Sequence, residues 1–216
     1  MRLTIIAATG GIGRHLLQQA QAAGHEVTVV VRDPAKLDGN ARVITADLAS
    51  PNTHALAAAV HDADAVLSGL GATSRRDAGI AARGTAAIIA AMRATTARRL
   101  AVVSASPIAS LPPHSPSDAD DDWLARALLN PPVKRIFRAV YADLAAMEAE
   151  LRDSDLDWTV VRPPRLINRP RTGRYRTAVG RNVRGGRMIG RADVADYMLT
   201  LLGLSETLRQ PVGIAY

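Results

Sequence analysis

The sequence predicts an α/β fold in which a doubly wound parallel sheet carries a small C-terminal lobe. Three observations support this prediction. In the first half of the chain, short apolar runs alternate five times with stretches of helical spacing, which requires a parallel sheet with helices on both faces. The apolar runs are continuous, as is typical of parallel strands that are covered on both sides. A glycine cluster joins the first run to the first helical stretch, as in doubly wound folds.

The elements of the first half follow from this hydrophobic period. Strands are expected at residues 3–8, 27–31, 42–45, 65–68 and 100–104. Helices are expected at 12–23, at 53–60 and from about 79 to 95. Gly24 ends the first helix, since glycine is the usual residue just past a helix end.

The regular alternation stops after Ser104. Residues 106–122 hold four prolines and four aspartates, and we expect a loop there, at the carboxyl end of a strand where loops line ligands. Residues 165–190 are rich in glycine and arginine and are expected to add nothing to the core. The other expected elements are a helix at 133–152, strands at 157–161, 175–179 and 187–189, a helix around 194–202, and an edge strand at 211–216.

A chain of 216 residues fits one α/β core, so residues 1–216 are expected to form a single domain, with the lobe built from about 106–122 and 163–190. The absence of cysteine excludes disulfides and thiolate metal sites, and the five histidines form no ligand cluster, so no metal is expected. No apolar stretch reaches the roughly 18 residues of a membrane span, and no signal-peptide pattern is present. We therefore expect a cytoplasmic protein without a membrane partner.

The net charge of +7 is unevenly distributed along the chain. Residues 101–160 carry five basic and ten acidic groups, whereas residues 161–216 carry eleven basic and three acidic groups. Ten arginines lie from Arg162 to Arg191 with no acidic residue among them. Nucleic acid is not favoured as a partner, because the chain has only seven aromatic residues for base stacking and no helix-turn-helix pattern. An anionic small molecule, or a plain solvated loop, fits the arginine run better.

The strongest functional signal is the segment Ala7-Ala8-Thr9-Gly10-Gly11-Ile12-Gly13 between the first strand and the first helix. Small residues there let a diphosphate approach backbone N–H groups at the positive end of the helix. Gly10 would make the close approach and Gly13 would let the helix pack on the sheet, while Ala7 takes the place of the first glycine of the usual pattern. The alternative is a tight connection without a ligand.

The residues after the second strand indicate which dinucleotide would bind. Arg32 is placed to pair with a 2′-phosphate through its fork of donors, and Lys36 adds a second positive charge, which favours NADP(H). The alternative is an exposed Arg32 beside Asp33, which would accept from a ribose 2′-hydroxyl as in NAD sites. Asp47 follows the third strand, where it could accept from the adenine amine or cap the adjacent turn.

Several motifs together carry a family resemblance. They are AATGGIG, VRDPAKL, the ADL after the third strand, DAVLSGLG, LDWTVVRPPRL, TGRYR and RMIGRADVADYML. With them the chain resembles the atypical short-chain dehydrogenase/reductases, and among these the biliverdin-IXβ reductase and flavin reductase group with its bacterial relatives. The resemblance runs over nearly the whole chain and implies a Rossmann fold that binds NAD(P)H.

The resemblance also implies roles for individual residues. The diphosphate would lie on Thr9, Gly10, Gly11, Ile12 and Gly13, the 2′-phosphate on Arg32 and Lys36, the adenine on Asp47 and Leu48, and the adjoining ribose and phosphate on Leu70 and Gly71. Ser104 would lie near the nicotinamide, whose carboxamide would be flanked by Pro163, Pro164, Arg165 and Leu166. The biliverdin and flavin reductases have histidine in place of Arg165 and serine in place of Ala105, so the implied acceptor stays open.

Three residues are candidates for catalysis. Tyr141 is the nearest counterpart of the catalytic tyrosine of the more familiar short-chain dehydrogenases, but Ala145 stands where the lysine that lowers its pKa would be. Packing on the long helix is therefore the alternative for Tyr141. Ser104 could hydrogen-bond the nicotinamide or the substrate, or only satisfy the backbone at a strand end. Arg165 could stabilise a developing anion or a substrate phosphate or carboxylate, or face solvent.

These residues lead to three functional hypotheses. The first is an NADPH-dependent reductase that transfers a hydride to a planar, anionic acceptor such as a flavin, a quinone or a tetrapyrrole-like molecule, with the proton taken from solvent. The second is a non-enzymatic regulatory protein that senses NADP(H). The third is an NAD(P)-dependent carbonyl reductase or isomerase, for which Tyr141 would have to line the pocket. A monomer and a homodimer are both compatible with the sequence.

Overall fold

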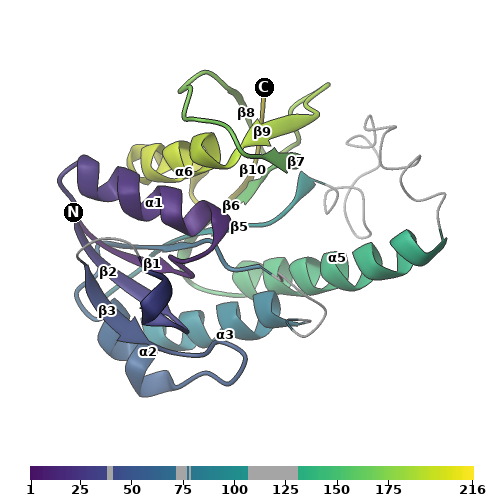
Figure 1. The fold of residues 1–216 in the computed structure, drawn as a ribbon. Coiled ribbons are helices and arrows are strands. Elements are labelled where there is room, and N and C mark those ends of the chain that lie inside the picture. Colours follow the sequence, from purple (N-terminus) through teal and green to yellow (C-terminus); the bar gives the residue numbers. More distant parts are fainter. Residues whose placement is uncertain (38–40, 72–76, 78, 107–130) are drawn as a thin grey trace.

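The computed structural model describes residues 1–37, 41–71, 77, 79–106 and 131–216 (Figure 1). The loop expected at 106–122 therefore lies outside the described residues, apart from Ser106. The described segments form a central sheet with helices on both of its faces and a smaller sheet near the C-terminal part of the chain.

Within the described residues, the central sheet contains eight strands in the order β3-β2-β1-β4-β5-β6-β10-β8. Their bounds are β1 (Arg2–Ile6), β2 (Glu26–Val31), β3 (Arg42–Thr45), β4 (Ala65–Ser68), β5 (Arg99–Val103), β6 (Asp157–Arg162), β8 (Arg176–Val179) and β10 (Gln210–Ala215). The paired strands run parallel, except that β8 is antiparallel to β10. The order reverses between β1 and β4, as in doubly wound folds, so the predicted fold class is confirmed.

Helices α1 (Gly11–Ala22) and α6 (Arg191–Thr200) cover one face of the sheet, and α2 (Thr53–Val60), α3 (Ile80–Arg93) and α5 (Pro131–Arg152) cover the other (Figure 1). Short 3-10 helices lie at Pro34–Lys36 (η1), Leu201–Gly203 (η5) and Ser205–Thr207 (η6). Successive strand residues face opposite sides, so Ile5 joins the core beneath α1 and α6, and Ile6 joins the core beneath α2, α3 and α5. Burial on both faces explains why the strand sequences are continuously apolar.

Two expectations for the C-terminal part are wrong. The strand β10 is not at the edge, because it pairs with β6 on one side and with β8 on the other. The sequence predicts β8 itself but gives no sign that this short, mostly exposed strand returns to cover β10. Segment 165–190 also contributes to the core, since Ile189 is fully buried beneath α1 and α6. Ile189 belongs to β9 (Met188–Gly190), which pairs in parallel with β7 (Arg165–Ile167) in the second sheet.

The buried carboxylate of Asp193 fastens the segment between β7 and β8 to α6. Its oxygens accept hydrogen bonds from the backbone N–H groups of Thr172 and Gly173, at 2.7 and 2.9 Å, and from the hydroxyls of Thr172 and Tyr216, at 2.9 and 2.7 Å. Burial acts to raise the pKa of Asp193, but the hydrogen bonds from Tyr216, Gly173 and Thr172 outweigh it and leave this pKa below its ordinary value. The ionised carboxylate therefore stabilises this part of the fold.

We predict that Asp193→Asn lowers the free energy of unfolding at pH 7 by about 1 to 3 kcal/mol, because an amide cannot accept all of these hydrogen bonds. A depressed folded-state pKa contributes stability above the unfolded-state value of about 3.9, and that stability is lost as the pH falls through the folded-state pKa. Denaturant unfolding at pH 7 and below pH 4 measures this, and the gap between wild type and variant should narrow in acid. Tyr216→Phe is the control that keeps the Asp193 charge and removes the two hydrogen bonds of the tyrosine hydroxyl, one donated to Asp193 and one accepted from the N–H of Gly190. Because the carboxylate keeps its other three hydrogen bonds, the cost of this variant should depend less on pH than the cost of Asp193→Asn. A gap that does not depend on pH would contradict this account of Asp193.

Candidate functional site

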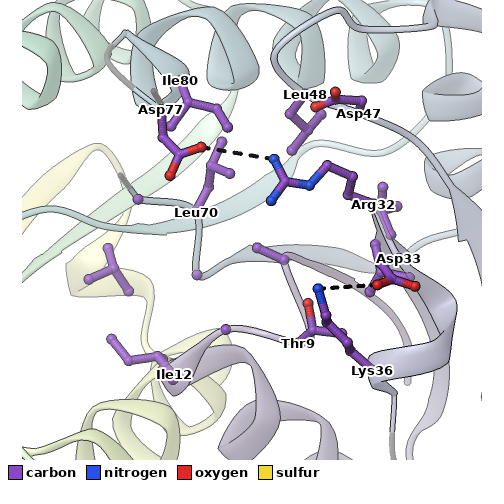
Figure 2. A pocket seen from close by; sticks show the side chains of 18 of the residues that line it. Thr9, Ile12, Arg32, Asp33, Lys36, Asp47, Leu48, Leu70, Asp77 and Ile80 are labelled. Atoms are coloured by element: carbon purple, nitrogen blue, oxygen red, sulfur yellow. Dashed lines mark ion pairs between the residues drawn. The ribbon is translucent and has the colours of Figure 1, made fainter. Parts of the chain in front are cut away.

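A pocket of about 430 Å³ opens at the carboxyl edge of the sheet, where the strand order reverses between β1 and β4 (Figure 2). Doubly wound sheets bind ligands at this position. The lining comes from the turns after β1, β2, β3 and β4, from the ends of β2 and β5, from β7, and from the helices α1, α3, α5 and α6. It includes these residues predicted from the sequence: Thr9, Gly10, Gly11, Ile12, Arg32, Lys36, Asp47, Leu48, Leu70, Gly71, Ser104 and Leu166.

The glycine turn lies at the middle of the pocket. The N–H of Gly10 donates to the carbonyl of Ala7 at 2.9 Å, which closes the turn before α1. Ala7 has a φ of 59°, in the left-handed region that glycine adopts without strain, which explains why glycine is usual at this position. No side chain caps the first turn of α1, so its N–H groups can bind an anion at the positive end of the helix.

Gly13 lies outside the pocket lining and has a packing role instead. A Cβ at this position would lie 2.1 Å from the carbonyl oxygen of Ala7 and 2.8 Å from the Cα of Ala8. Only glycine therefore lets α1 approach the turn after β1 this closely. Gly10 lines the pocket and Gly13 lies at this packing contact, while diphosphate binding by either residue stays a prediction.

Two cations and two carboxylates surround the outer end of the pocket (Figure 2). Lys36 Nζ lies 3.1 Å from Asp33 Oδ2, and Asp33 Oδ1 accepts from the N–H of Ala35 at 3.1 Å. The hydrogen bond from Lys36, together with that from Ala35, lowers the pKa of the Asp33 carboxyl. Arg32 extends across the pocket toward Asp77, but their closest atoms are 3.9 Å apart and the Arg32 side chain is 64% exposed. Arg32 can therefore turn its donors to a ligand, whereas Asp33 is engaged with local partners.

Asp47 caps a turn and also lines the pocket. Its Oδ1 accepts a hydrogen bond from the N–H of Ala49 at 3.0 Å, so Asp47 does cap the turn, as one of its two expected roles requires. The other expected role, contact with adenine, stays a prediction. The adjoining lining residues Leu48, Leu70 and Ile80 are apolar and buried. They give this part of the pocket an apolar wall beside the Asp47 carboxylate.

The inner end of the pocket is apolar except for Ser104. The apolar residues there are Val103, Val140, Leu144 and Leu166. Ser104 directly follows β5, and its hydroxyl donates to Glu148 Oε1 at 2.7 Å rather than to a backbone carbonyl. Glu148 forms an ion pair with Arg162, and both side chains are only 3% exposed. Sequence reasoning missed Glu148, because 44 residues separate it from Ser104 and only the packing of α5 on the sheet brings them together.

Three predicted residues near the end of β6 lie outside the pocket lining. Pro163 and Pro164 are buried, and the carbonyl of Pro163 accepts from the N–H of Ser106 at 2.9 Å. Arg165 is exposed at the start of β7. Because successive strand residues face opposite sides, the side chain of Arg165 points away from that of Leu166, which does line the pocket.

Tyr141 also lies outside the lining that the described residues form. It packs half-buried against the core beneath α2, α3 and α5, together with Ala145. Burial raises the pKa of Tyr141, which makes it a weaker acid than an exposed tyrosine. These observations fit the packing alternative for this side chain.

Arg191, the first residue of α6, lines the pocket although the sequence analysis did not single it out. Its Nη1 donates to Asn168 Oδ1 at 2.8 Å, which holds the guanidinium in place. A Cβ at Gly11 would lie 2.9 Å from the Arg191 side chain, so this cation lies against the uncapped start of α1. The only sequence signal was its place in the arginine run, which does not distinguish it from its neighbours.

Among the described residues, no group of three or more histidine, aspartate or glutamate side chains could hold a metal ion. In the same part of the chain, no helix has the length and apolar character needed to cross a bilayer.

Residues 7–203 match a family of NAD(P)H-binding proteins, and the chain belongs to this family, as its resemblance to the atypical short-chain dehydrogenase/reductases implies. It is 29% identical over 192 residues to the UPF0659 protein C216.03 of Schizosaccharomyces pombe, with 80% of this chain and 74% of that one covered. ChuY of Escherichia coli O157:H7, described as an anaerobillin reductase, is 20% identical with a TM-score of 0.77 over 100% of this chain and 97% of that one. A short-chain dehydrogenase/reductase of Veillonella parvula DSM 2008 in complex with NADP is 20% identical with a TM-score of 0.75 over 100% and 94%.

We predict that Gly13→Ala lowers the free energy of unfolding by about 3 kcal/mol or more, because the new methyl group would collide with the backbone of Ala7 and Ala8 in the turn after β1. Gly203→Ala is the matched control, since no atom lies within 4 Å of a Cβ at that position. It should change stability by less than about 1 kcal/mol. Denaturant unfolding of both variants measures the difference, and equal effects would contradict the packing role of Gly13.

Proposed function

We propose that this protein is an NADPH-dependent reductase that transfers a hydride to a planar, anionic acceptor of the flavin, quinone or tetrapyrrole-like kind. One observation carries the proposal, namely the order of groups along a single pocket. Arg32 and Lys36 lie at the outer end, the uncapped start of α1 with Arg191 in the middle, and an apolar surface around Ser104 at the inner end. This order corresponds to the 2′-phosphate, the diphosphate and the nicotinamide of NADPH.

The residues present fit this cofactor. At the glycine turn, Gly10 and Gly11 line the pocket without a side chain, so a diphosphate can approach the backbone at the uncapped start of α1. Arg32 presents an exposed guanidinium, which pairs well with a phosphate through several donors. Asp33 is engaged with Lys36 and Ala35, so it is less available to a ribose 2′-hydroxyl. The NADP complex of the Veillonella parvula relative, which shares the fold, adds support for NADP(H).

The inner end of the pocket suits hydride transfer between flat rings. When bound, NADPH supplies a hydride from its nicotinamide ring. Val103, Leu144 and Leu166 form apolar walls that exclude water and orient a planar acceptor. No acidic side chain from the described residues lines this inner end, so we expect the accompanying proton to come from solvent.

The alternatives differ from the reductase in testable ways. A carbonyl reductase or isomerase of the usual kind is not favoured, because such an enzyme needs a side chain that donates a hydrogen bond to the substrate carbonyl. Tyr141 does not line the described pocket, and the Ser104 hydroxyl donates its hydrogen bond to Glu148. A regulatory protein that senses NADP(H) would share the cofactor site and differ only in having no turnover. The relative ChuY is described as a reductase, which supports turnover here.

The test is NADPH oxidation by the purified protein with FMN as the acceptor in the absence of oxygen, with NADH run in parallel. We expect oxidation well above the uncatalysed rate, and faster with NADPH than with NADH. Tight NADPH binding without turnover on FMN, a small quinone and a linear tetrapyrrole would contradict the reductase and favour the regulatory protein.

Arg32→Gln is expected to raise the Kd of NADPH about tenfold or more and the Kd of NADH less than about threefold, because only NADPH carries a 2′-phosphate. Arg191→Gln is the matched charge removal, and it should weaken both cofactors by a similar factor because both carry the diphosphate. Fluorescence titration of the reduced nicotinamide gives each Kd. Equal weakening of NADPH and NADH by Arg32→Gln would remove the 2′-phosphate assignment.

A further inference from the structure

Ser104, Glu148 and Arg162 form a buried network directly behind the inner end of the pocket. All three residues are at most 6% exposed. Glu148 Oε1 accepts from the Ser104 hydroxyl at 2.7 Å and from Arg162 Nε at 3.1 Å, while Oε2 accepts from an Arg162 Nη nitrogen. Of the three side chains, only Ser104 lines the pocket. Among the described residues, the serine hydroxyl is therefore the group that connects the ion pair to the pocket.

The pairing fixes where the hydroxyl proton lies. A carboxylate that is paired with a guanidinium is ionised and can only accept hydrogen bonds. The single proton of the Ser104 hydroxyl is therefore directed to Glu148, and the oxygen keeps its lone pairs for another donor. The main chain of Ser104 is fixed as well, because its N–H donates to the carbonyl of Val161 at 2.8 Å. Toward the pocket, Ser104 is a hydrogen-bond acceptor and not a donor.

The position of Glu148 on α5 continues the pocket wall. Val140, Leu144 and Glu148 are spaced four residues apart and so share one face of the helix. Val140 and Leu144 line the pocket, and the carboxylate comes next along the same face, behind Ser104. Removing the charges of Glu148 and Arg162 from water is unfavourable unless hydrogen bonds compensate, and Ser104 supplies one of those hydrogen bonds.

We infer that Glu148, held by Arg162, is a positioning residue that makes Ser104 accept a hydrogen bond from the carboxamide N–H of the nicotinamide. This inference rests on the proposed function, since it takes the inner end of the pocket to be the nicotinamide end. The carboxamide is the group of the cofactor's reactive ring that carries N–H donors. A hydrogen bond from this N–H to Ser104 fixes the rotation of the nicotinamide ring. It thereby fixes which face of the ring is turned toward the hydride acceptor.

The experiment compares the binding of NADP⁺ with that of its 3-acetylpyridine analogue, in which a methyl group replaces the carboxamide NH₂. Calorimetric titration of the wild-type protein should give an affinity for NADP⁺ about five- to tenfold higher, as expected for one hydrogen bond. Ser104→Ala should reduce this ratio to about one. Glu148→Gln should also reduce the ratio to about one, although Ser104 is intact. The glutamine NH₂ group can donate a hydrogen bond to the Ser104 oxygen, and the Ser104 hydroxyl can then donate toward the pocket instead of accepting. Ser106→Ala is the control in the same strand-end segment, outside the pocket lining, and should keep the wild-type ratio.

A second variant covers the case in which Glu148→Gln does not fold because the buried charge of Arg162 has lost the opposite charge of Glu148. In Glu148→Leu with Arg162→Met both charges are removed together, and the ratio should again be about one. A wild-type ratio of one, or Glu148 variants that bind NADP⁺ and keep the wild-type ratio, would overturn this inference and leave the proposed function standing. If neither NADP⁺ nor NADPH bound at all, the proposed function itself would fail, and this inference with it.

Discussion

The close approach of Gly13 to the backbone of Ala7 determines where α1 lies on the sheet. Because the helix is held there, its uncapped N-terminus opens onto the pocket, and α6 packs beside α1 with Arg191 against Gly11. The left-handed backbone of Ala7 belongs to the same arrangement, since it directs the Ala7 carbonyl to the N–H of Gly10. Local strain of this kind persists where the surrounding structure enforces it. The part of the site proposed to bind the diphosphate thus depends on one contact between α1 and the turn after β1.

Charge is organised in opposite ways at the two ends of the pocket. At the outer end, Arg32 and Lys36 are exposed and pair with Asp77 and Asp33, and such surface pairs contribute little to stability. A phosphate can therefore replace these partners at small cost. At the inner end the ion pair is buried, and removing one partner of such a pair is strongly destabilising. The outer end can adapt to a charged group, while the inner end is fixed, which suits the alignment of a reactive ring.

Local sequence patterns suffice to predict the strands of the central sheet, the first-half helices and the glycine turn. These features depend on neighbouring residues, so continuous apolar runs and glycine spacing reveal them. The placement of Arg32, Lys36, Asp47 and Leu48 around one pocket could also be predicted, because carboxyl ends of parallel strands meet at one edge of the sheet.

Other features depend on packing between distant segments, which no local pattern contains. Glu148 reaches Ser104 only because α5 crosses the sheet behind β5, and Arg191 reaches Gly11 only because α6 packs beside α1. The strand β10 lies inside the sheet because β8 pairs with its outer side. The residues of β8 are mostly exposed, so their sequence does not indicate this pairing. A sequence motif also does not show which of two adjacent strand residues faces the pocket. The motif includes both Arg165 and Leu166, yet strand alternation brings only Leu166 to the pocket.

If Arg32 and Lys36 hold a 2′-phosphate, the outer end of the pocket must discriminate between nucleotides that differ only in that group. Calorimetric titration with 2′,5′-ADP and with 5′-AMP measures this most directly, because the two ligands share the adenosine and the 5′-phosphate. The expected result is that 2′,5′-ADP binds at least about tenfold more tightly, with a difference that shrinks as the ionic strength rises. Equal affinities for the two nucleotides would contradict the assignment of this pocket to NADP(H).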